Sequence, residues 1–299
     1  MDIRKIRYFI SVAETLNFTR AARRHYISQT AMSQQIALLE EELGVILFER
    51  STNKVKLTNA GSFFLKEAVV IVEKLEYAVL QTRKIAQGSC SSFTCGYSDP
   101  IELDILRTIA DSYLQEYPNA DIRFDEQNFS ILLEKVNNGT CDVAFFPESE
   151  IWNLQDIRKL TLYLDKIILA VSRNHPKARL GKIPAIEVAN EKIIMLSQEA
   201  GPNNYKTMLQ YCRKDGYEPN IVELVPTFDM LMLLVELNRG VCFVPNTWRN
   251  KANDKLAFLE IEGTTHMITI EMAWRKDNKN EGLKAFIEVA KRFAYNETV

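Results

Sequence analysis

The sequence has few residues of the kinds that build metal sites and disulfide frameworks. None of its three histidines lies near another, and its cysteines include no Cys-x-x-Cys pair. A zinc site or a set of disulfides is therefore not expected. We interpret the five cysteines as small buried hydrophobic residues: Cys90, Cys95, Cys141, Cys212 and Cys242. A redox pair of Cys90 and Cys95 stays open, although a strand would aim residues five apart at opposite faces.

Long apolar runs are also missing. No stretch approaches the roughly 18 apolar residues that a membrane-spanning helix needs, and the first residues, MDIRKIRYFISVAE, place charges where a signal peptide would be apolar. We therefore expect a cytoplasmic protein with no membrane partner. The sequence contains no nucleophile elbow, phosphate-binding loop, metal cluster or catalytic dyad, so neither an enzyme nor a cofactor is expected.

What is present is the composition of an ordinary globular chain, with 46% hydrophobic and 25% charged residues over 299 residues. This length allows two or three cores. The net charge of −2 is unevenly distributed: residues 1–88 carry 13 basic and 9 acidic residues, a net of +4, and residues 89–299 carry 24 and 30, a net of −6. The asymmetry suits a protein whose first part meets a polyanion while its second part has another role.

Helices are predicted at the start of the chain. Apolar residues recur with helical spacing over residues 3–13, and Thr19 is expected to cap a short second helix. Ser28 is expected to cap a third helix that extends to Leu43 and ends at Gly44.

The third helix has two different faces. Its apolar stripe follows 4, 3 and 4 spacing: Met32, Ile36, Leu39 and Leu43. The opposite face near its start carries short or amide side chains and no acid: Gln29, Thr30, Ser33, Gln34 and Ala37. Such side chains can hydrogen-bond base edges or phosphates in a major groove, and the positive N-terminal end of the helix dipole favours phosphate.

A short basic hairpin, or wing, is predicted next. Residues 54–57 alternate lysine with an apolar side chain, after a polar turn at residues 51–53. The cations that would flank a DNA backbone are Arg50, Lys54 and Lys56. Each phosphate that they neutralise should add about 0.9 to the slope of log affinity against log salt. A three-helix packing domain with a solvated basic hairpin is the alternative interpretation.

Residues 1–61 also carry a long motif: Phe9, Val12, Ala13, Phe18, Thr19, Ala21, Ala22, Ser28, Gln29, Ser33, Gln34, Gln35, Ile36, Leu39, Glu40, Leu43, Gly44, Leu47, Phe48, Glu49, Arg50, Leu57, Thr58, Asn59, Ala60 and Gly61. This run resembles the DNA-binding domain of LysR-type transcriptional regulators. By position, the resemblance places base and phosphate contacts on these residues: Gln29, Thr30, Ser33, Gln34 and Arg50. Thr30 stands where the family usually has proline and Gln34 where it often has arginine, which weakens the phosphate contact expected at Gln34.

One long helix is predicted after the hairpin. Proline is absent from residues 58–87, and the only glycine, Gly61, lies at the start, where Thr58 or Asn59 is the expected cap. A helix of about 28 residues would be roughly 42 Å long. An apolar stripe with coiled-coil spacing runs along it: Leu65, Ala68, Val72, Leu75 and Val79. The stripe either packs on its own domain or pairs two chains, and the family resemblance implies pairing. A dimer would read two half-sites about one helical turn, or ~34 Å, apart.

Beyond a small polar hinge at residues 88–92, short apolar runs alternate with amphipathic helices. The predicted strands are residues 93–97, 121–124, 141–146, 166–172, 193–196, 221–225, 241–244 and 268–274, and the predicted helices are residues 102–117, 131–137, 203–214, 227–238 and 281–293. This alternation implies parallel β-α-β units with helices on both faces. In such sheets ligands bind beyond the carboxyl ends of the strands, at loops that lead into helix N-termini.

We therefore predict a multi-domain chain with α and α/β parts. The parts are a winged helix-turn-helix (1–58), a linker and dimerisation helix (59–88) and a two-lobed α/β domain (89–299), whose lobe I is residues 89–164 and 268–299 and lobe II residues 165–267. The last part resembles the effector domain of LysR-type regulators, which is similar to periplasmic solute-binding proteins. The resemblance implies a ligand cleft between the lobes.

The candidates for effector contact lie where strands should end and helices begin: Ser98, Asp99, Asn128, Ser130, Gln198, Glu199, Thr227 and Phe228. Each could instead be a helix cap or a turn residue, and Ser130 and Thr227 are favoured for ligand contact. Asp99 and Glu199 would repel the small carboxylate that the family resemblance suggests, so an amine-bearing or neutral effector is an alternative.

These features favour a transcriptional regulator that binds double-stranded DNA as a homodimer, or as a pair of dimers forming a homotetramer, under the control of a small-molecule effector. An effector can change DNA binding only if it binds two states of the protein with different affinity. A solute-binding module is one alternative, but it would need a signal peptide and would have no use for a wing. An enzyme is the other.

Overall fold

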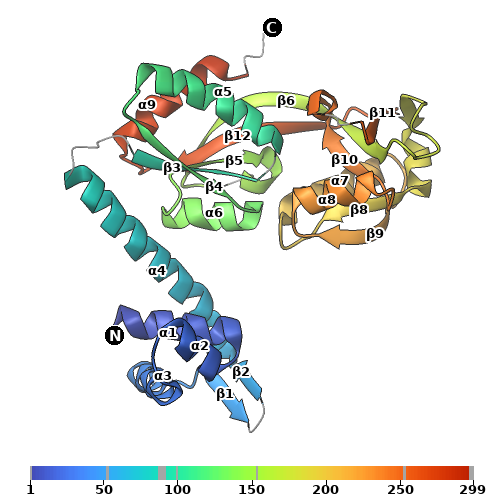
Figure 1. Cartoon of the computed structure of the whole chain (residues 1–299). Coiled ribbons are helices and arrows are strands. Elements are labelled where there is room, and N and C mark those ends of the chain that lie inside the picture. The colour runs from blue at the N-terminus through green and yellow to red at the C-terminus, as the bar shows by residue number, and fades with distance from the viewer. Residues whose placement is uncertain are drawn as a thin grey trace. The chain divides into compact units, whose positions relative to one another are not determined.

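The computed structural model describes residues 2–51, 54–86, 92–98, 100–152, 154–251 and 254–295. The chain divides into two compact units, Met1–Ala86 and Gln87–Val299, each with its own hydrophobic core (Figure 1). The hinge expected at residues 88–92 lies outside the described residues, apart from Ser92. None of the described helices is long and apolar enough to span a membrane.

The first unit consists of helices and one hairpin. Its elements are α1 (Ile3–Thr15), α2 (Phe18–Arg24), α3 (Gln29–Leu43), β1 (Phe48–Ser51), β2 (Lys54–Leu57) and α4 (Asn59–Ala86). The predicted limits of α3 are confirmed, because Ser28 Oγ accepts a hydrogen bond from the Ala31 N–H at 3.1 Å and Gly44 ends the helix with a φ of 69°. The predicted wing is the antiparallel pair β1–β2, and Thr58 Oγ1 caps α4 by accepting from the Gly61 N–H at 2.9 Å.

The cap predicted for α2 is wrong by two residues. Asn17 precedes the helix, and its Oδ1 accepts a hydrogen bond from the Arg20 N–H at 2.9 Å. Thr19 is instead an exposed residue of the first turn. Asparagine is at least as good an N-cap as threonine, and a start at Phe18 lets that ring pack against Phe48 in the core.

Aromatic side chains hold the first unit together. Phe9 of α1 is completely buried and lies against Phe48 of β1 and Phe64 of α4, with ring centroids 5.3 and 5.1 Å apart. Burying a side chain of this size stabilises a fold by about 1.5–3 kcal/mol. The start of α4 passes so close to the wing that a Cβ on Gly61 would collide with the Leu47 carbonyl oxygen. The helices and the wing therefore share one core.

The second unit is an α/β domain with two lobes. Its strands are β3 (Ser92–Tyr97), β4 (Asp121–Glu126), β5 (Val143–Pro147), β6 (Ile157–Ser172), β7 (Lys182–Pro184), β8 (Lys192–Leu196), β9 (Asn220–Val225), β10 (Cys242–Pro245), β11 (Leu256–Glu262) and β12 (Met267–Arg275). Its helices are α5 (Pro100–Glu116), α6 (Phe129–Asn138), α7 (Pro202–Lys214), α8 (Phe228–Glu236) and α9 (Glu281–Ala290), with short 3-10 helices η1 (Glu148–Ile151), η2 (Ala185–Asn190), η3 (Asn246–Lys251) and η4 (Lys291–Phe293). We call lobe I the part whose hydrophobic clusters join β3, β4, β5, α5, α6, η1 and α9, and lobe II the part whose clusters join β8, β9, β10, α7 and α8.

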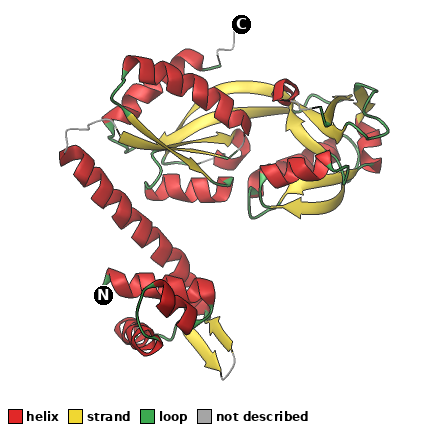
Figure 2. Ribbon diagram, viewed as in Figure 1, coloured by secondary structure: helices red, strands yellow, loops and turns green. Residues whose placement is uncertain are grey.

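The sheet is mixed rather than purely parallel. The strand order is β4-β3-β5-β12-β6-β11-β7, with β10 paired to β6 and β8 to β9 in a separate sheet. The predicted parallel pairing joins β3 to β4 and β5, and β8 to β9. Strand β12, however, is antiparallel to both β5 and β6. The reason is that the chain crosses from lobe I to lobe II along β6 and returns along β12, so that the two strands run in opposite directions. They form a long pair, from Ile157 opposite Arg275 to Lys166 opposite Met267 (Figure 2).

Helices cover both faces of the lobe I sheet, as predicted. Figure 1 shows α5 and α9 on one face of β3 and β5, and α6 on the other. Phe93 of β3 lies next to Tyr113 of α5 and Phe286 of α9, with ring centroids 5.8 and 5.0 Å apart. On the other face, Leu132 of α6 packs with Phe146 of β5. Because α5 and α6 pack on opposite faces of the same sheet, the positions of their first residues relative to the strands are fixed.

The described cysteines are buried, and none of them forms a disulfide: Cys95, Cys141, Cys212 and Cys242. Burial raises the pKa of the thiols of Cys95, Cys141 and Cys212. Cys90 lies outside the described residues. A redox role for Cys95 is disfavoured, because a buried thiol that does not ionise reacts slowly.

We predict that these four thiols are inert in the native protein. In a Cys90→Ser variant, reaction with 5,5′-dithiobis(2-nitrobenzoate) should stay at least about 100-fold slower than that of an exposed thiol up to about pH 9. Burial blocks access to all four thiols, and it also raises the pKa of Cys95, Cys141 and Cys212. Adding Leu180→Cys, at a position 62% exposed, provides the exposed control. Rapid titration of any native thiol in Cys90→Ser would contradict the prediction.

Candidate nucleic-acid interface and ligand cavity

The start of α3 presents a polar flank to solvent. Gln29, Thr30 and Gln34 are exposed and Ser33 is half-buried. Gln29 Nε2 donates a hydrogen bond to Ser33 Oγ at 3.0 Å, which orders two side chains on adjacent turns. The first turn contains no acidic residue. The predicted contact residues of this helix therefore lie together at an accessible helix end that can approach a polyanion.

The opposite flank of α3 fixes the direction in which the polar flank points. Met32, Ile36 and Leu39 are completely buried in the core of the first unit. Near the end of the helix, Glu40 Oε1 accepts hydrogen bonds from the backbone N–H groups of residues 47 and 48, at 2.8 and 3.1 Å. Hydrogen bonds to a charged acceptor each contribute about 1.5–3 kcal/mol. Apolar packing and Glu40 thus join α3 to the wing.

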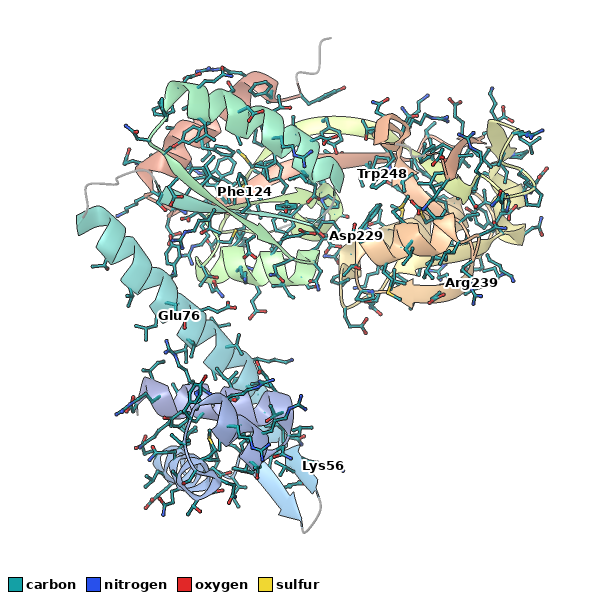
Figure 3. The ribbon with its side chains drawn as sticks, viewed as in Figure 1. Lys56, Glu76, Phe124, Asp229, Arg239 and Trp248 are labelled. Atoms are coloured by element: carbon teal, nitrogen blue, oxygen red, sulfur yellow. The ribbon has the colours of Figure 1, made fainter. Side chains whose placement is uncertain are left out.

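The wing adds cations to the first unit. Glu49 on β1 lies opposite Lys56 on β2, and the Lys56 side chain is exposed at the hairpin (Figure 3). The side chains of Arg50 and Lys54 lie outside the described part of the structure, although both residues belong to the paired strands. Thr19, also predicted as a DNA contact, is exposed near the start of α2.

Sequence reasoning missed an exposed aromatic residue at the entrance to α3. Tyr26 is 97% exposed and has a positive φ of 56°. This conformation is uncommon for a bulky residue, and it belongs to the turn that connects α2 to α3. Periodic patterns predict exposure only within helices and strands. Tyr26 lies in a turn between two helices, so no pattern in the sequence signals that its side chain is exposed.

The predicted dimerisation stripe on α4 divides into two parts. Leu65, Ala68 and Val72 pack against the core of the first unit, and Ala68 is completely buried there. Leu75 and Val79, further along, are 40% and 42% exposed. The alternative that the stripe packs on its own domain therefore holds for its first half. Ala68, being enclosed by its own unit, is corrected from a dimer contact to a core residue.

An accessible apolar strip remains on the later turns of α4. It consists of Ile71, Leu75 and Val79, and Ile71 is 42% exposed. Residues four apart lie on one helix face, so the three aliphatic side chains are neighbours. We call them the α4 strip. The sequence stripe omitted Ile71 because strict 3 and 4 spacing passes through Val72 instead.

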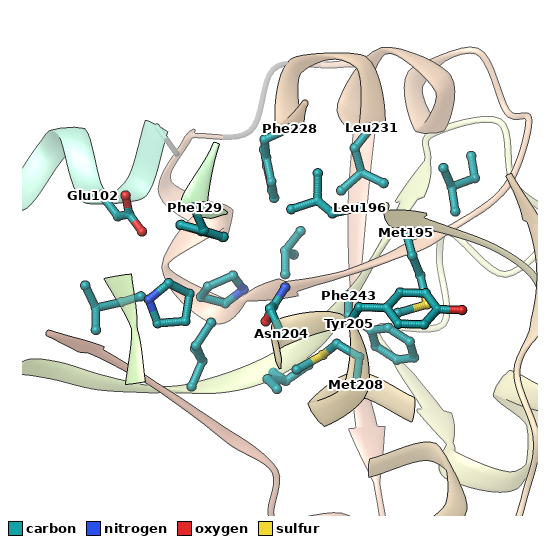
Figure 4. Close-up of a pocket in the computed structure, with 17 residues that line it drawn as sticks. Glu102, Phe129, Met195, Leu196, Asn204, Tyr205, Met208, Phe228, Leu231 and Phe243 are labelled. Carbon is teal, nitrogen blue, oxygen red and sulfur yellow. The ribbon is translucent and has the colours of Figure 1, made fainter. Parts of the chain in front are cut away.

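An apolar cavity lies between the two lobes of the second unit (Figure 4). Lobe I contributes Glu102, Phe129 and Pro147, the crossing strands contribute Ile167, Ile268 and Ile270, and lobe II contributes Ile194, Met195, Leu196, Asn204, Tyr205, Met208, Phe228, Leu231, Phe243, Val244 and Pro245. Most of these residues belong to strands and helices whose apolar pattern fits core packing. That is why the sequence did not mark them as ligand contacts, Phe228 excepted.

Among the described residues that line the cavity, those with polar side chains are Glu102, Asn204 and Tyr205. Glu102 is only 1% exposed, and its Oε2 accepts a hydrogen bond from the Ser98 N–H at 2.9 Å. The carboxylate therefore satisfies a backbone donor that precedes α5. Sequence reasoning missed Glu102 because only the fold reveals that this acid is buried.

Several predicted effector contacts surround a second hollow, which we call the outer pocket. They are Ser98, Asn128, Thr227 and Phe228, and the outer pocket shares Phe228 with the cavity. Asn128 Oδ1 accepts a hydrogen bond from the Ile131 N–H at 3.0 Å, and Thr227 Oγ1 accepts from the Met230 N–H at 3.3 Å. Both side chains are thus helix caps that also line a pocket.

Three other predicted effector contacts, Ser130, Gln198 and Glu199, lie outside the described lining of both hollows. The Ser130 backbone N–H donates to the Ala200 carbonyl oxygen at 3.2 Å, so Ser130 acts through its backbone. Gln198 and Glu199 are exposed, because a turn in which the Ala200 N–H donates to the Ser197 carbonyl at 3.1 Å leaves them at its tip. Asp99 is not among the described residues.

Hydrogen bonds connect the lobes next to the cavity. Glu150 of η1 accepts from the Asn204 N–H of α7 at 2.6 Å, and Ser130 of α6 donates to Ala200 as described. Glu150 is buried, and burial raises the pKa of its carboxyl group. Because Asn204 also lines the cavity, a ligand there would lie beside a contact that holds the lobes together.

Two family models match the chain. The model described as "Bacterial regulatory helix-turn-helix protein, lysR family" matches residues 3–62, and the model described as "LysR substrate binding domain" matches residues 86–294. The regulator AlsR of Bacillus subtilis (strain 168) is 29% identical over 97% of this chain and 95% of its own length.

Solved structures agree with these matches. The crystal structure of CbnR, a LysR family transcriptional regulator, has a TM-score of 0.79 and 25% identity, covering 99% of this chain and all of CbnR. Full-length CbnR complexed with its target DNA has a TM-score of 0.74 and 26% identity, covering 98% and 100% of the two chains.

We predict that the Glu150 carboxylate holds α7 against lobe I. Glu150→Ala should leave the first N–H groups of α7 without an acceptor and speed their hydrogen exchange by about 2- to 30-fold, the equivalent of a lost cap. Glu150→Gln keeps an acceptor oxygen and should change the exchange less. Glu148→Ala, which alters an exposed acid of the same 3-10 helix, is the control. Equal protection of α7 in the Glu150→Ala and Glu148→Ala variants would refute this role.

Proposed function

Because the chain belongs to the LysR family of bacterial transcriptional regulators, we propose that it binds operator DNA as a dimer and that a small molecule between its lobes alters this binding. The chain is a DNA-binding regulator with an N-terminal helix-turn-helix and a C-terminal effector-binding domain. Such a protein works where it meets DNA, and we place it in the bacterial cytoplasm on that ground.

The acid-free flank of α3 carries the proposal for DNA binding. Gln29 and Ser33 combine amide and hydroxyl groups, which can donate and accept hydrogen bonds as base edges require. Thr30 and Gln34 lie exposed beside them and extend the contact to neighbouring bases and phosphates. The buried opposite flank supports this reading, because it prevents the helix from turning its polar residues away from the groove.

Cations and the turn before α3 would bind the phosphate backbone. Arg50, Lys54 and Lys56 on the wing supply charge that is independent of base sequence. Thr19 near the start of α2 supplies a hydroxyl, and Tyr26 supplies a second one at the entrance to α3. These contacts would set the register in which α3 enters the groove.

A second copy of the chain is the partner that best suits the α4 strip. An isolated chain would leave Ile71, Leu75 and Val79 in water, whereas a two-fold pair of α4 helices would bury all three. The second unit offers similar surfaces at its sheet edges, with Phe124 on β4 (Figure 3) and Leu224 on β9, which are 53% and 47% exposed. Edge strands of this kind are normally covered.

A pair of dimers would use both surfaces at once, α4 in one contact and the sheet edges in the other. In this arrangement, an effector that favours one separation of the lobes would move the sheet edges and thereby the spacing of the recognition helices. The effector must bind the two lobe arrangements with different affinity, since equal affinity shifts nothing.

We predict that base contacts and phosphate contacts respond differently to mutation. Gln29→Ala or Ser33→Ala should weaken operator binding by about 1–3 kcal/mol and leave binding to random duplex nearly unchanged. Arg50→Ala should weaken both equally and lower the salt slope by about 0.9. Gel-shift titrations on the DNA upstream of the chain's own gene measure these effects.

Gln35→Ala is the control, since this α3 residue lies off the polar flank and should leave operator affinity within about twofold. Equal losses on operator and random duplex for Gln29→Ala would rule out base reading by α3.

We predict that charge on the α4 strip separates the subunits. The double variant Leu75→Glu and Val79→Glu should raise the dissociation constant for self-association by about 100-fold or more, because it removes the burial of four aliphatic side chains per dimer. Sedimentation equilibrium measures this constant. Lys66→Glu, an exposed charge reversal on the opposite face of α4, should leave it unchanged. A double variant that self-associates as tightly as the parent would exclude pairing through the strip.

A further inference from the structure

We propose that the cavity between the lobes takes an apolar ligand whose polar end is neutral or cationic, and that it discriminates against carboxylates. The inference rests on the proposed effector role of this cavity and adds the chemical class of the effector. Its basis is the chemistry of the lining and the way in which the surrounding helix ends are already occupied.

The described part of the lining offers no counter-ion to an anion. Among the described residues that line the cavity, none is Lys, Arg or His, and the ionisable residues are Glu102 and Tyr205. The described lining of the outer pocket also lacks a basic residue and contains two acids, Glu126 and Asp229. Lys206 lines an adjoining groove, which shares Pro147, Asn204, Met208 and Ile268 with the cavity, but it is not among the described residues of the cavity lining. A buried anion without a cation is strongly disfavoured.

Helix N-termini could replace a cation, because their free N–H groups and the helix dipole attract anions. Helices α5, α6, α7 and α8 each contribute a residue from their first turn to the cavity: Glu102, Phe129, Asn204 and Phe228. The beginnings of four helices therefore border the space in which a carboxylate would have to bind.

The chain's own acceptors already occupy donors at these helix ends. Glu102 Oε2 takes the Ser98 N–H at 2.9 Å before α5, and Glu150 Oε1 takes the Asn204 N–H at 2.6 Å in α7. Asn128 and Thr227 cap α6 and α8 with neutral oxygens. At two of the four helix beginnings, the acceptor is thus an acidic side chain of the protein itself.

Glu102 decides which polar group fits best. Its side chain is nearly fully buried and lines the cavity, so the polar end of a ligand there would meet an acid and no base. An ammonium or hydroxyl group could donate to its oxygens, whereas a second carboxylate beside it would find no counter-ion. Figure 4 shows Glu102 at one end of the cavity, with Met195 and Phe243 at the other. A ligand would place its polar end toward Glu102 and its apolar body toward lobe II.

Matched probes test the inference on the full-length protein. Isothermal titration at pH 7.5 compares hexylamine, 1-hexanol and hexanoate, and then benzylamine, benzyl alcohol and benzoate. Within each set the apolar body is constant and only the polar end changes. We expect the amine and the alcohol to bind at least about 10-fold more tightly than the carboxylate, because only the carboxylate must be buried beside Glu102 without a counter-ion.

Two variants assign the binding to this cavity. Glu102→Gln should weaken the amine about 10-fold, leave the alcohol within about threefold and improve the carboxylate, while Glu199→Gln, an exposed acid outside the lining, should change none of them. Leu196→Trp, at a half-buried position that lines both the cavity and the outer pocket, should abolish binding of the alcohol and leave binding to random duplex DNA unchanged.

Carboxylates that bind as tightly as the amines would overturn the inference and leave the effector role of the cavity standing. Unchanged binding of the alcohol in Leu196→Trp would place the ligand elsewhere and overturn it as well. Failure of every probe to bind would overturn both the inference and the effector role of the cavity, whereas loss of DNA binding alone would bear only on the proposed function of α3.

Discussion

The burial of one flank of α3 is the constraint on which the DNA-binding account depends. Met32, Ile36 and Leu39 have no exposed surface, so rotation of the helix would bring all three into water at about 1.5–3 kcal/mol each. The Glu40 carboxylate adds a polar restraint by holding the first residues of the wing. A polar flank opposite such an anchor has a fixed direction, which is the property that reading of base edges requires.

The burial of apolar side chains also determines the role of each part of α4. Its first turns complete the core of the first unit, where Ala68 is enclosed, and its later turns extend past that core and leave Leu75 uncovered. One continuous stripe therefore serves two purposes, because a helix longer than the body it packs against must expose the remainder. In the second unit, β6 and β12 also serve two purposes, because they join the lobes and line the apolar cavity between them.

The sequence was sufficient for local features and insufficient for long-range ones. Ser28 and Gly44 marked the limits of α3 because capping is decided within a few residues. The cap at Asn17 was missed because Thr19 is an almost equally good candidate. The antiparallel crossing pair could not be predicted, since strand direction depends on partners about 110 residues away in β6 and β12. The buried acid Glu102 was missed for the same reason.

The most direct test of the account is to locate α3 on DNA chemically. An iron chelate attached to a Thr30→Cys, Cys90→Ser variant cuts only the bases next to it, because the other described thiols are buried. We expect cleavage confined to two segments of the operator about one helical turn, or ~34 Å, apart. Cleavage spread evenly along the duplex, or none at all under conditions in which the protein is bound, would contradict the placement of this helix against base pairs.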